Sequence, residues 1–386
     1  MSAATPCGLS NSPRRRALKV LIGAGCLAWV APARAITEQE QRERILFATR
    51  EDEAYVESQG WLFGDAALDA YLQSVMDRLY PERQGKFRVR ALRDTEFNAF
   101  AVATGTVFVH TGALLRLRNE AELAAVLGHE GGHLVADHLY RGAVDAKSVA
   151  RISAALSLGL STSLPRLGAL FENSTMAGFS RDFERQADRI GFERLTAAGY
   201  EPKAAAPVFE RWARELAERK VKQGPYLFAD HPRLLERAHE FAKLAIDAPA
   251  GELRREEYIA ATHATRMTTL EWIRTRQNGA ELIAVLREEG LTADFAPAGE
   301  FLLGEGYRFR ALDDDETRAL EHYTRSIEQY PDYAAAYGAR GRLRARRGEH
   351  AAAIADLERF VSLTPSASDV PFALQTINHL KKESAE

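Results

Sequence analysis

Two histidines and a glutamate, His129, Glu130 and His133, are spaced as metal-assisted hydrolysis requires. On an α-helix, residues four apart lie about 40° apart on one face, so both imidazoles can bind one zinc ion. Glu130 emerges about 100° further round the helix, where it can reach a water molecule beside the metal. The alternative is a pair of solvated histidines. It does not explain why Gly131 and Gly132, each costing about 1 kcal/mol relative to alanine, interrupt a strong helix.

A hydrolytic zinc site takes three protein ligands, and acidic residues downstream offer a third. Within residues 180–188, Glu184 and Asp188 are four apart and therefore share a helix face. If Glu184 binds the metal, Asp188 can accept a hydrogen bond from a ligating imidazole and raise its basicity. Taken alone, this charged run also fits a solvent-exposed helix face.

Helices and a few short strands are predicted around these residues, so the fold class is α+β. The stretch from about 120 to 139 is rich in Leu and Ala and lacks Pro, which predicts the helix that carries both histidines. Apolar residues at helical spacing predict a helix over 61–80. The segments 87–92 and 106–109 predict two or three strands in all. Further helices are predicted at about 182–198, 203–222 and 233–246.

The C-terminal part of the chain is predicted to be all-helical after a boundary at the Pro-Ala-Gly sequence of 249–251. Pro331 and Pro365 are 34 residues apart, the period of tetratricopeptide repeats, and apolar positions between them align at the same offset. Two such repeats are predicted over 298–365. Because two copies are too few for a free-standing solenoid, we expect them to pack on the 255–295 helices and on the metal-binding domain.

The predicted domains follow from these boundaries. They are a signal peptide at 1–35, the metal-binding domain at 36–248, a helical linker region at 249–297 and repeat helices at 298–386.

The first 35 residues are typical of an export signal, with a basic end, an apolar stretch and a small-x-small cleavage site at 33–35. A short membrane anchor is the alternative, although the apolar run is shorter than the ~20 residues that a bilayer requires. The basic end leaves a twin-arginine and an ordinary secretory route open. Cys26 fits either a lipid-attachment site or a cysteine inside a cleaved segment. We therefore expect an exported protein, with peripheral membrane association left open.

Composition limits the other classes of function. The formal net charge is -3, which excludes a chain-wide basic surface for nucleic acid. The only two cysteines are Cys7 and Cys26, so neither a disulfide framework nor a Cys-ligated metal site can stabilise the rest. The apolar segment 150–171 contains an uninterrupted run only over 152–164, too short to cross a bilayer. A buried helix or a lid over a cleft is expected there, and no transmembrane segment in the mature chain.

Taken in their order, these motifs resemble the M48 family of zinc metallopeptidases, in particular exported periplasmic members that carry tetratricopeptide repeats. The resemblance covers about 61–245 and then the repeats. The motifs that carry it are Asn98–Ala101, Gly105 with Val107–Val109, Gly112–Leu115, Glu122–Ala124, His129-Glu130, His133, Ser180-Arg181, Glu184, Ala187-Asp188, His231-Pro232 and Arg237. Two positions depart from the family pattern: Gly131 replaces a bulky aliphatic residue, and Thr104 replaces a glycine.

The resemblance implies a mainly helical zincin-type domain with a small β-sheet and one zinc ion per chain. It implies His129, His133 and Glu184 as the zinc ligands, Glu130 as the general base and Asp188 as an outer partner of a ligand. It also implies that His231 and Arg237 face the metal and stabilise the oxyanion, and that the equivalent histidine caps the zinc in some exported members. His231 as a loop residue and Arg237 as a structural ion-pair partner are the alternatives.

Asn98 resembles the start of an edge strand that would hold an extended substrate by main-chain pairing. The remaining histidines have no partner at ligand spacing, so exposed or core roles are expected for them: His110, His138, His239, His263, His322, His350 and His379.

The function that these features predict is a zinc metalloendopeptidase of the bacterial cell envelope. It would hydrolyse protein or peptide substrates in protein quality control, with the repeats binding substrates or partners such as envelope assembly machinery, and no nucleic acid. The first alternative is an envelope assembly factor or chaperone with a latent zinc site. The second is a purely structural zinc site.

Overall fold

The structure is a computed structural model that describes residues 37–144, 181–218, 234–288 and 290–384. The predicted export signal at 1–35, the whole apolar segment at 150–171 and His231 lie outside the described residues. Among the helices that are described, none is both long enough and apolar enough to cross a bilayer.

A three-stranded sheet forms the β part of the fold. Its strands are β1 (Arg88–Leu92), β2 (Ala99–Ala101) and β3 (Thr106–His110), in the order β1-β3-β2. β3 pairs in parallel with β1 and antiparallel with β2. In this sheet β2 is therefore an edge strand, and the predicted two or three strands are confirmed as three.

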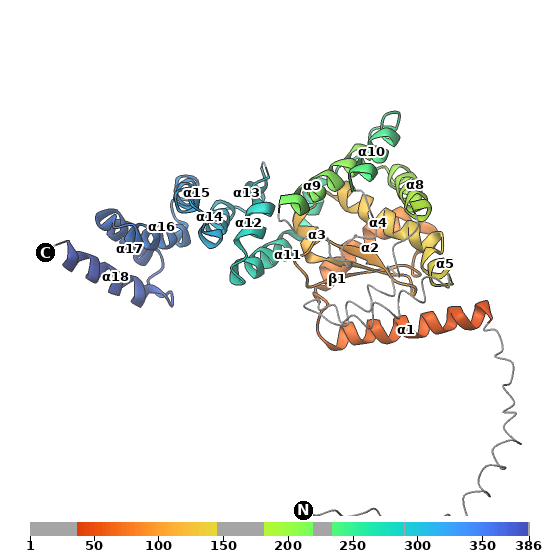
Figure 1. Cartoon of the computed structure of the whole chain (residues 1–386), viewed down its shortest axis with the longest axis horizontal. Helices are drawn as coiled ribbons and strands as arrows, with labels where there is room; N and C mark the ends of the chain where they lie inside the picture. Colours follow the sequence, from red (N-terminus) through yellow and green to blue (C-terminus); the bar gives the residue numbers. More distant parts are fainter. Residues whose placement is uncertain (1–36, 145–180, 219–233, 289, 385–386) are drawn as a thin grey trace, which may run out of the picture. The chain divides into compact units, whose positions relative to one another are not determined.

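Helices cover this sheet and carry the candidate ligands (Figure 1). α2 (Ala66–Leu79) packs along β1, and α4 (Glu120–Val135) packs against β2. The other elements of this region are α1 (Glu38–Ser58), η2 (Pro81–Arg83), α3 (Thr111–Arg116), α5 (His138–Val144), α8 (Arg181–Ala197), η3 (Pro202–Ala204), α9 (Ala205–Glu218) and α10 (Leu234–Leu244). The helices predicted at 61–80, 182–198, 203–222 and 233–246 are confirmed in type where the structure describes them, and residues 219–222 and 233 lie outside the described residues.

The helix predicted over 120–139 is in fact two helices. Asn119 caps the first by accepting a hydrogen bond from the Glu122 backbone N–H. That helix, α4, ends at Val135, and Asp137 then adopts a left-handed conformation with φ of 57°. A right-handed helix cannot continue through such a residue, so α5 begins in a new direction at His138.

Small residues bring α4 and α8 into close contact. A Cβ atom on Gly132 would lie 2.7 Å from the carbonyl oxygen of Ala187, and one on Gly128 would lie 3.0 Å from that of Gly191. Gly131 faces Tyr80 and not α8: a Cβ atom on Gly131 would lie 2.2 Å from a carbon of the Tyr80 ring. The glycines that weaken α4 locally are thus required by its packing, and the departure at Gly131 is explained by the ring beside it.

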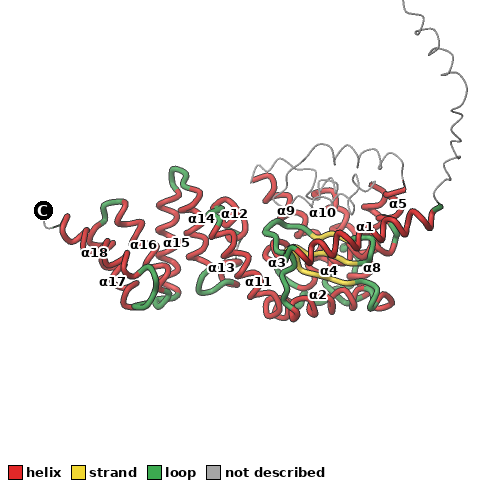
Figure 2. Tube along the Cα trace, turned by 90° about the horizontal axis from the view of Figure 1, so that it is seen from below, coloured by secondary structure: helices red, strands yellow, loops and turns green. Residues whose placement is uncertain are grey.

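The C-terminal part is all-helical, as predicted, and Figure 2 follows its helices in chain order. They are α11 (Arg255–Thr275), α12 (Gly279–Leu286), α13 (Leu291–Asp294), α14 (Gly299–Arg310), α15 (Asp315–Gln329), α16 (Ala334–Arg346), α17 (His350–Leu363) and α18 (Val370–Glu383). α14 packs with α15 and α16 with α17, so two helix pairs occupy the range of the predicted repeats. Their assignment as tetratricopeptide repeats stays a prediction.

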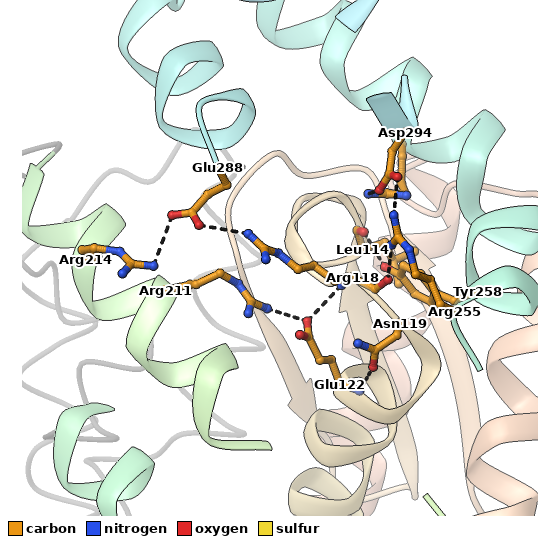
Figure 3. Close-up of polar contacts among 11 residues, drawn as sticks. Leu114, Arg118, Asn119, Glu122, Arg211, Arg214, Arg255, Tyr258, Glu288 and Asp294 are labelled. Atoms are coloured by element: carbon orange, nitrogen blue, oxygen red, sulfur yellow. Dashed lines mark hydrogen bonds and ion pairs between the residues drawn. The ribbon is translucent and has the colours of Figure 1, made fainter. Parts of the chain in front are cut away.

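Buried and part-buried ion pairs join these helices to the region that contains the sheet (Figure 3). The Arg118 guanidinium contacts Glu288 at 2.9 Å, and Glu288 also accepts from Arg214 on α9 at 3.2 Å. Next to them, buried Arg116 contacts both Glu215 at 2.6 Å and Glu281 at 3.2 Å. Among these pairs, only Arg116–Glu281 is both buried and shared between the two regions, so it is the contact that most opposes their separation. The part-exposed pairs of Glu288 add little to this.

Candidate metal centre

His129, His133 and Glu184 meet at one buried point between α4 and α8. The Nε2 atoms of the two histidines lie 3.1 Å apart. Glu184 places Oε1 at 3.4 Å from Nε2 of His133 and Oε2 at 3.6 Å from Nε2 of His129. All three side chains are buried, and their donor atoms lie within 4.8 Å of one another. The solvent-exposed alternative for the 180–188 run is therefore wrong for Glu184.

The chemistry of this donor set fits a divalent cation. Two imidazole nitrogens and one carboxylate are the ligand set of hydrolytic zinc sites. A second carboxylate, Glu130, is buried close by, and its Oε1 atom has no hydrogen-bond partner among the described residues. Burial and the neighbouring Glu184 carboxylate raise the pKa of Glu130 to about 8. Buried carboxylates this close repel each other, and a cation between the imidazoles would relieve that repulsion.

Asp188 supports one of the two histidines from behind. Its Oδ1 atom lies 2.8 Å from Nδ1 of His129, on the ring edge opposite the metal-facing Nε2. Arg237 on α10 donates to Asp188 from Nη2 at 2.6 Å and from Nε at 3.1 Å. Burial alone would raise the pKa of Asp188, but the Arg237 guanidinium and the His129 ring outweigh it and hold that pKa at about 2. Asp188 is therefore ionised and can orient the His129 ring.

Asp188→Asn is expected to weaken metal binding by about 10- to 100-fold, the usual effect of losing such an outer carboxylate. The same change leaves the buried Arg237 guanidinium without its counter-charge, so the apo-protein should also melt at a lower temperature. Zinc titration with a competing chelator and thermal melting measure the two effects. Unchanged zinc affinity in a folded Asp188→Asn variant would remove Asp188 from this role.

Glu130 is held by the edge strand of the sheet. The backbone N–H of Ala101 on β2 donates to Oε2 of Glu130 at 3.0 Å. Asn98 directly precedes β2, is buried, and its carbonyl oxygen accepts from the His110 N–H at 3.0 Å. The glutamate predicted to be the general base and the strand predicted to bind substrate are thus in direct contact.

The structure bears differently on His231 and Arg237, the two residues predicted to stabilise the oxyanion. His231 lies outside the described residues. Arg237 makes the ion pair with Asp188, and its guanidinium also lies over the ring of Phe209 at 4.3 Å from the centroid. The ion-pair alternative for Arg237 is therefore the contact that the structure contains, and a direct role at the oxyanion stays a prediction.

His138 is a residue near the site that the sequence does not point to. The expectation for it is an exposed or core role, but its Nδ1 atom lies 3.1 Å from Nδ1 of His133. On a continuous helix, five residues turn through about 140° net, which would place His138 on the far side from His133. The break at Asp137 changes that direction. The conformation of Asp137 is the missing information, and a single Asp in a helical pattern gives little signal for it.

Two histidines and a glutamate on one helix, with a third ligand from a second helix, define a metallopeptidase domain. Residues 65–245 match Peptidase family M48, and this part of the chain belongs to that family. Beta-barrel assembly-enhancing protease of Escherichia coli is 29% identical over 184 residues, which cover 44% of this chain and 37% of that protein.

Two further relatives have different names. Metalloprotease LoiP of Escherichia coli is 34% identical over 149 residues, 37% of this chain and 56% of that protein. Mitochondrial metalloendopeptidase OMA1 of Schizosaccharomyces pombe is 32% identical over 173 residues, 44% of this chain and 49% of that protein. The chain thus spans about two fifths to just over half of the length of these relatives.

Proposed function

We propose that this protein is a zinc-dependent endopeptidase of the bacterial cell envelope that hydrolyses peptide bonds in protein substrates. The observation that carries the proposal is the buried cluster of His129, His133 and Glu184 beside Glu130. One zinc ion would be held by these three side chains. The same cluster could serve a structural zinc site, but Glu130 favours hydrolysis because a structural site has no need of a buried carboxylate next to the ligands.

Glu130 can act as the general base at one defined atom. Its Oε2 accepts the Ala101 N–H, which leaves Oε1 to take a proton from the attacking water and to return it to the leaving amine. A zinc ion, when bound, supplies a Lewis acid that polarises the scissile carbonyl and lowers the pKa of water. Asp188 and Arg237 hold His129 in place during this reaction, and the resemblance assigns His231 to the oxyanion.

An extended substrate is proposed to pair with β2. An edge strand offers backbone groups that a peptide can use as the next strand, and Asn98 precedes that strand directly. Residues of the substrate that flank the scissile bond would then lie beside Glu130, because Glu130 is bonded to the same strand.

Periplasmic location and a role in quality control are part of the proposal. They are supported by the export signal predicted at 1–35 and by the name of the Escherichia coli relative, a beta-barrel assembly-enhancing protease. Contact with envelope assembly machinery is proposed on the same grounds, and the leader sequence leaves both a twin-arginine and an ordinary secretory route open.

The C-terminal helices are proposed to bind partners or substrates through a concave pocket. α14, α16 and α18 line a pocket of about 330 Å³, a size that suits a few side chains of a peptide. Phe372 is 59% exposed there, and the cationic residues are Arg308, Arg342 and Arg346. Arg308 is paired with Glu305, whereas Arg342 and Arg346 make exposed contacts at 3.4 Å to Asp369 and Glu316. Exposed pairs are weak, so both arginines can exchange partners.

An acidic peptide with an aromatic residue is therefore expected to bind better than its lysine counterpart. Arg342→Glu with Arg346→Glu should weaken that binding by about tenfold or more, equivalent to about 1.4 kcal/mol. Arg325→Glu with Arg359→Glu is the matched control, because both residues lie outside the pocket and also make exposed ion pairs. Fluorescence anisotropy measures the affinities, and equal weakening by the two double variants would contradict a specific pocket.

The alternative function is an assembly factor or chaperone whose zinc site is latent. Complementation of a deletion strain separates the two functions: failure of the Glu130→Gln variant to rescue supports cleavage, and full rescue supports binding. Zinc content must be measured on the same variant, because loss of the metal would also prevent rescue.

A further inference from the structure

We propose that His138 is a positioning residue that fixes the orientation and tautomer of His133, and that Gln186 in turn fixes the tautomer of His138. The inference rests on the proposed zinc function and adds two residues outside the ligand set. It starts from two contacts: Nδ1 of His138 lies 3.1 Å from Nδ1 of His133, and Nε2 of His138 lies 3.1 Å from Oε1 of Gln186.

The positions of the protons in this chain follow from the ligand geometry. His133 directs Nε2 toward His129 and Glu184, so a metal ion would take the lone pair of Nε2. A neutral imidazole that binds metal through Nε2 carries its proton on Nδ1. That N–H then donates to Nδ1 of His138, which as an acceptor must be without a proton.

Gln186 is the hydrogen-bond partner of the other ring nitrogen of His138. Because Nδ1 of His138 is the acceptor, its proton is on Nε2, and Nε2 donates to the amide oxygen of Gln186. The hydrogen bonds thus run in one direction, from His133 to His138 to Gln186. A carboxamide oxygen only accepts, so it favours the same His138 tautomer that His133 requires.

The His138 ring is held firmly enough to impose this orientation. It is buried and stacks on Phe183, with the ring centroids 4.2 Å apart and the planes 7° from parallel. Arg141 lies over the same Phe183 ring at 4.6 Å from the centroid. The left-handed Asp137 sets the direction from which the ring enters.

The two ligating histidines therefore have different supports. His129 donates to an ionised carboxylate, Asp188, whereas His133 donates to a neutral imidazole. In both cases an acceptor behind the ring keeps Nε2 directed at Glu184. A ligand imidazole that loses such an acceptor can rotate, and metal affinity typically falls about 10- to 100-fold.

Two substitutions separate this role from simple packing. His138→Asn keeps an acceptor near the place of Nδ1 but loses the ring that stacks on Phe183. His138→Phe keeps the stacked ring and loses both nitrogens. Each is made in a Glu130→Gln background to prevent self-cleavage, with His379→Phe, which changes an exposed histidine on α18, as the matched control.

Zinc affinity measured with a competing chelator gives the result, and circular dichroism verifies folding. We expect the phenylalanine variant to bind zinc about 10- to 100-fold more weakly than its parent, the asparagine variant to recover most of that loss, and the control to match the parent. If phenylalanine binds zinc as tightly as the parent, or more tightly than asparagine, His138 serves packing alone and the proposal is wrong.

The absorption spectrum of the cobalt-substituted protein gives a second reading, because it changes when a ligand imidazole is displaced. Neither measurement depends on cleavage. A protein that binds zinc as predicted but cleaves nothing would contradict the proposed function and leave the role of His138 intact.

Discussion

Glu130→Gln is expected to lower the rate of peptide hydrolysis by about 10²–10⁴-fold while zinc content stays at one ion per chain. The substituted amide oxygen can still accept the Ala101 N–H, so the side chain should keep its place against β2. What changes is the other terminal atom, which becomes an NH₂ group and cannot take a proton from water. The three ligand side chains are untouched.

The measurement is cleavage of an unfolded protein substrate by the purified variant, alongside zinc analysis. His133→Ala is the companion variant and should lose both zinc and activity, since it removes a ligand. Full activity in the glutamine variant would remove Glu130 from the role of base. Loss of zinc in that variant would instead mean that Glu130 contributes to metal binding.

Gly132→Ala is expected to abolish most zinc binding although residue 132 touches no metal. The new Cβ would lie 2.7 Å from the carbonyl oxygen of Ala187, and neither helix backbone can yield without moving the other. Overpacking of this kind costs about 1–3 kcal/mol. Any separation of α4 from α8 moves Glu184 away from the two histidines, because the ligands are divided between these helices.

The matched control is Gly142→Ala on α5, where a Cβ would have no described atom within 4 Å. This variant should bind zinc as the parent does, because alanine favours a helix. Zinc affinity and thermal melting of the apo-protein measure both variants. Normal zinc affinity in the Gly132→Ala variant would show that the helices can adjust, and that close packing is not what sets the ligand distances.

The sequence predicts the metal-binding helix, the α+β class and the helical C-terminal part because these depend on local patterns. Residues four apart on one helix must share a face, so His129 and His133 can be paired without a structure. Glu184 is harder, since nothing local links it to α4; the order of several motifs identifies it. Gly131 and Gly132 can be recognised in the sequence as unfavourable for a helix, but the reason for them lies in the neighbours that they face, which are Tyr80 for Gly131 and α8 for Gly132.

The parts that sequence reasoning misses depend on single backbone angles and on contacts between distant segments. One left-handed residue, Asp137, ends α4 early and turns His138 back toward His133. The resemblance predicts that Arg237 lies near the metal, but its hydrogen bond to Asp188 can be found only from the three-dimensional structure. Likewise, no local pattern marks Arg116 as the partner of acids 99 and 165 residues away.

The bond between Ala101 and Glu130 has a consequence for selectivity. If a substrate chain joins the sheet at β2, the strand that receives it is the strand that holds the proton acceptor. Substrate binding and catalysis would then be coupled. A natively folded client would not pair with β2, because its backbone N–H and C=O groups already form hydrogen bonds within its own fold. On the proposed function, such an enzyme would discriminate by conformational state more than by residue identity, and would spare mature proteins while cutting those that have failed to fold.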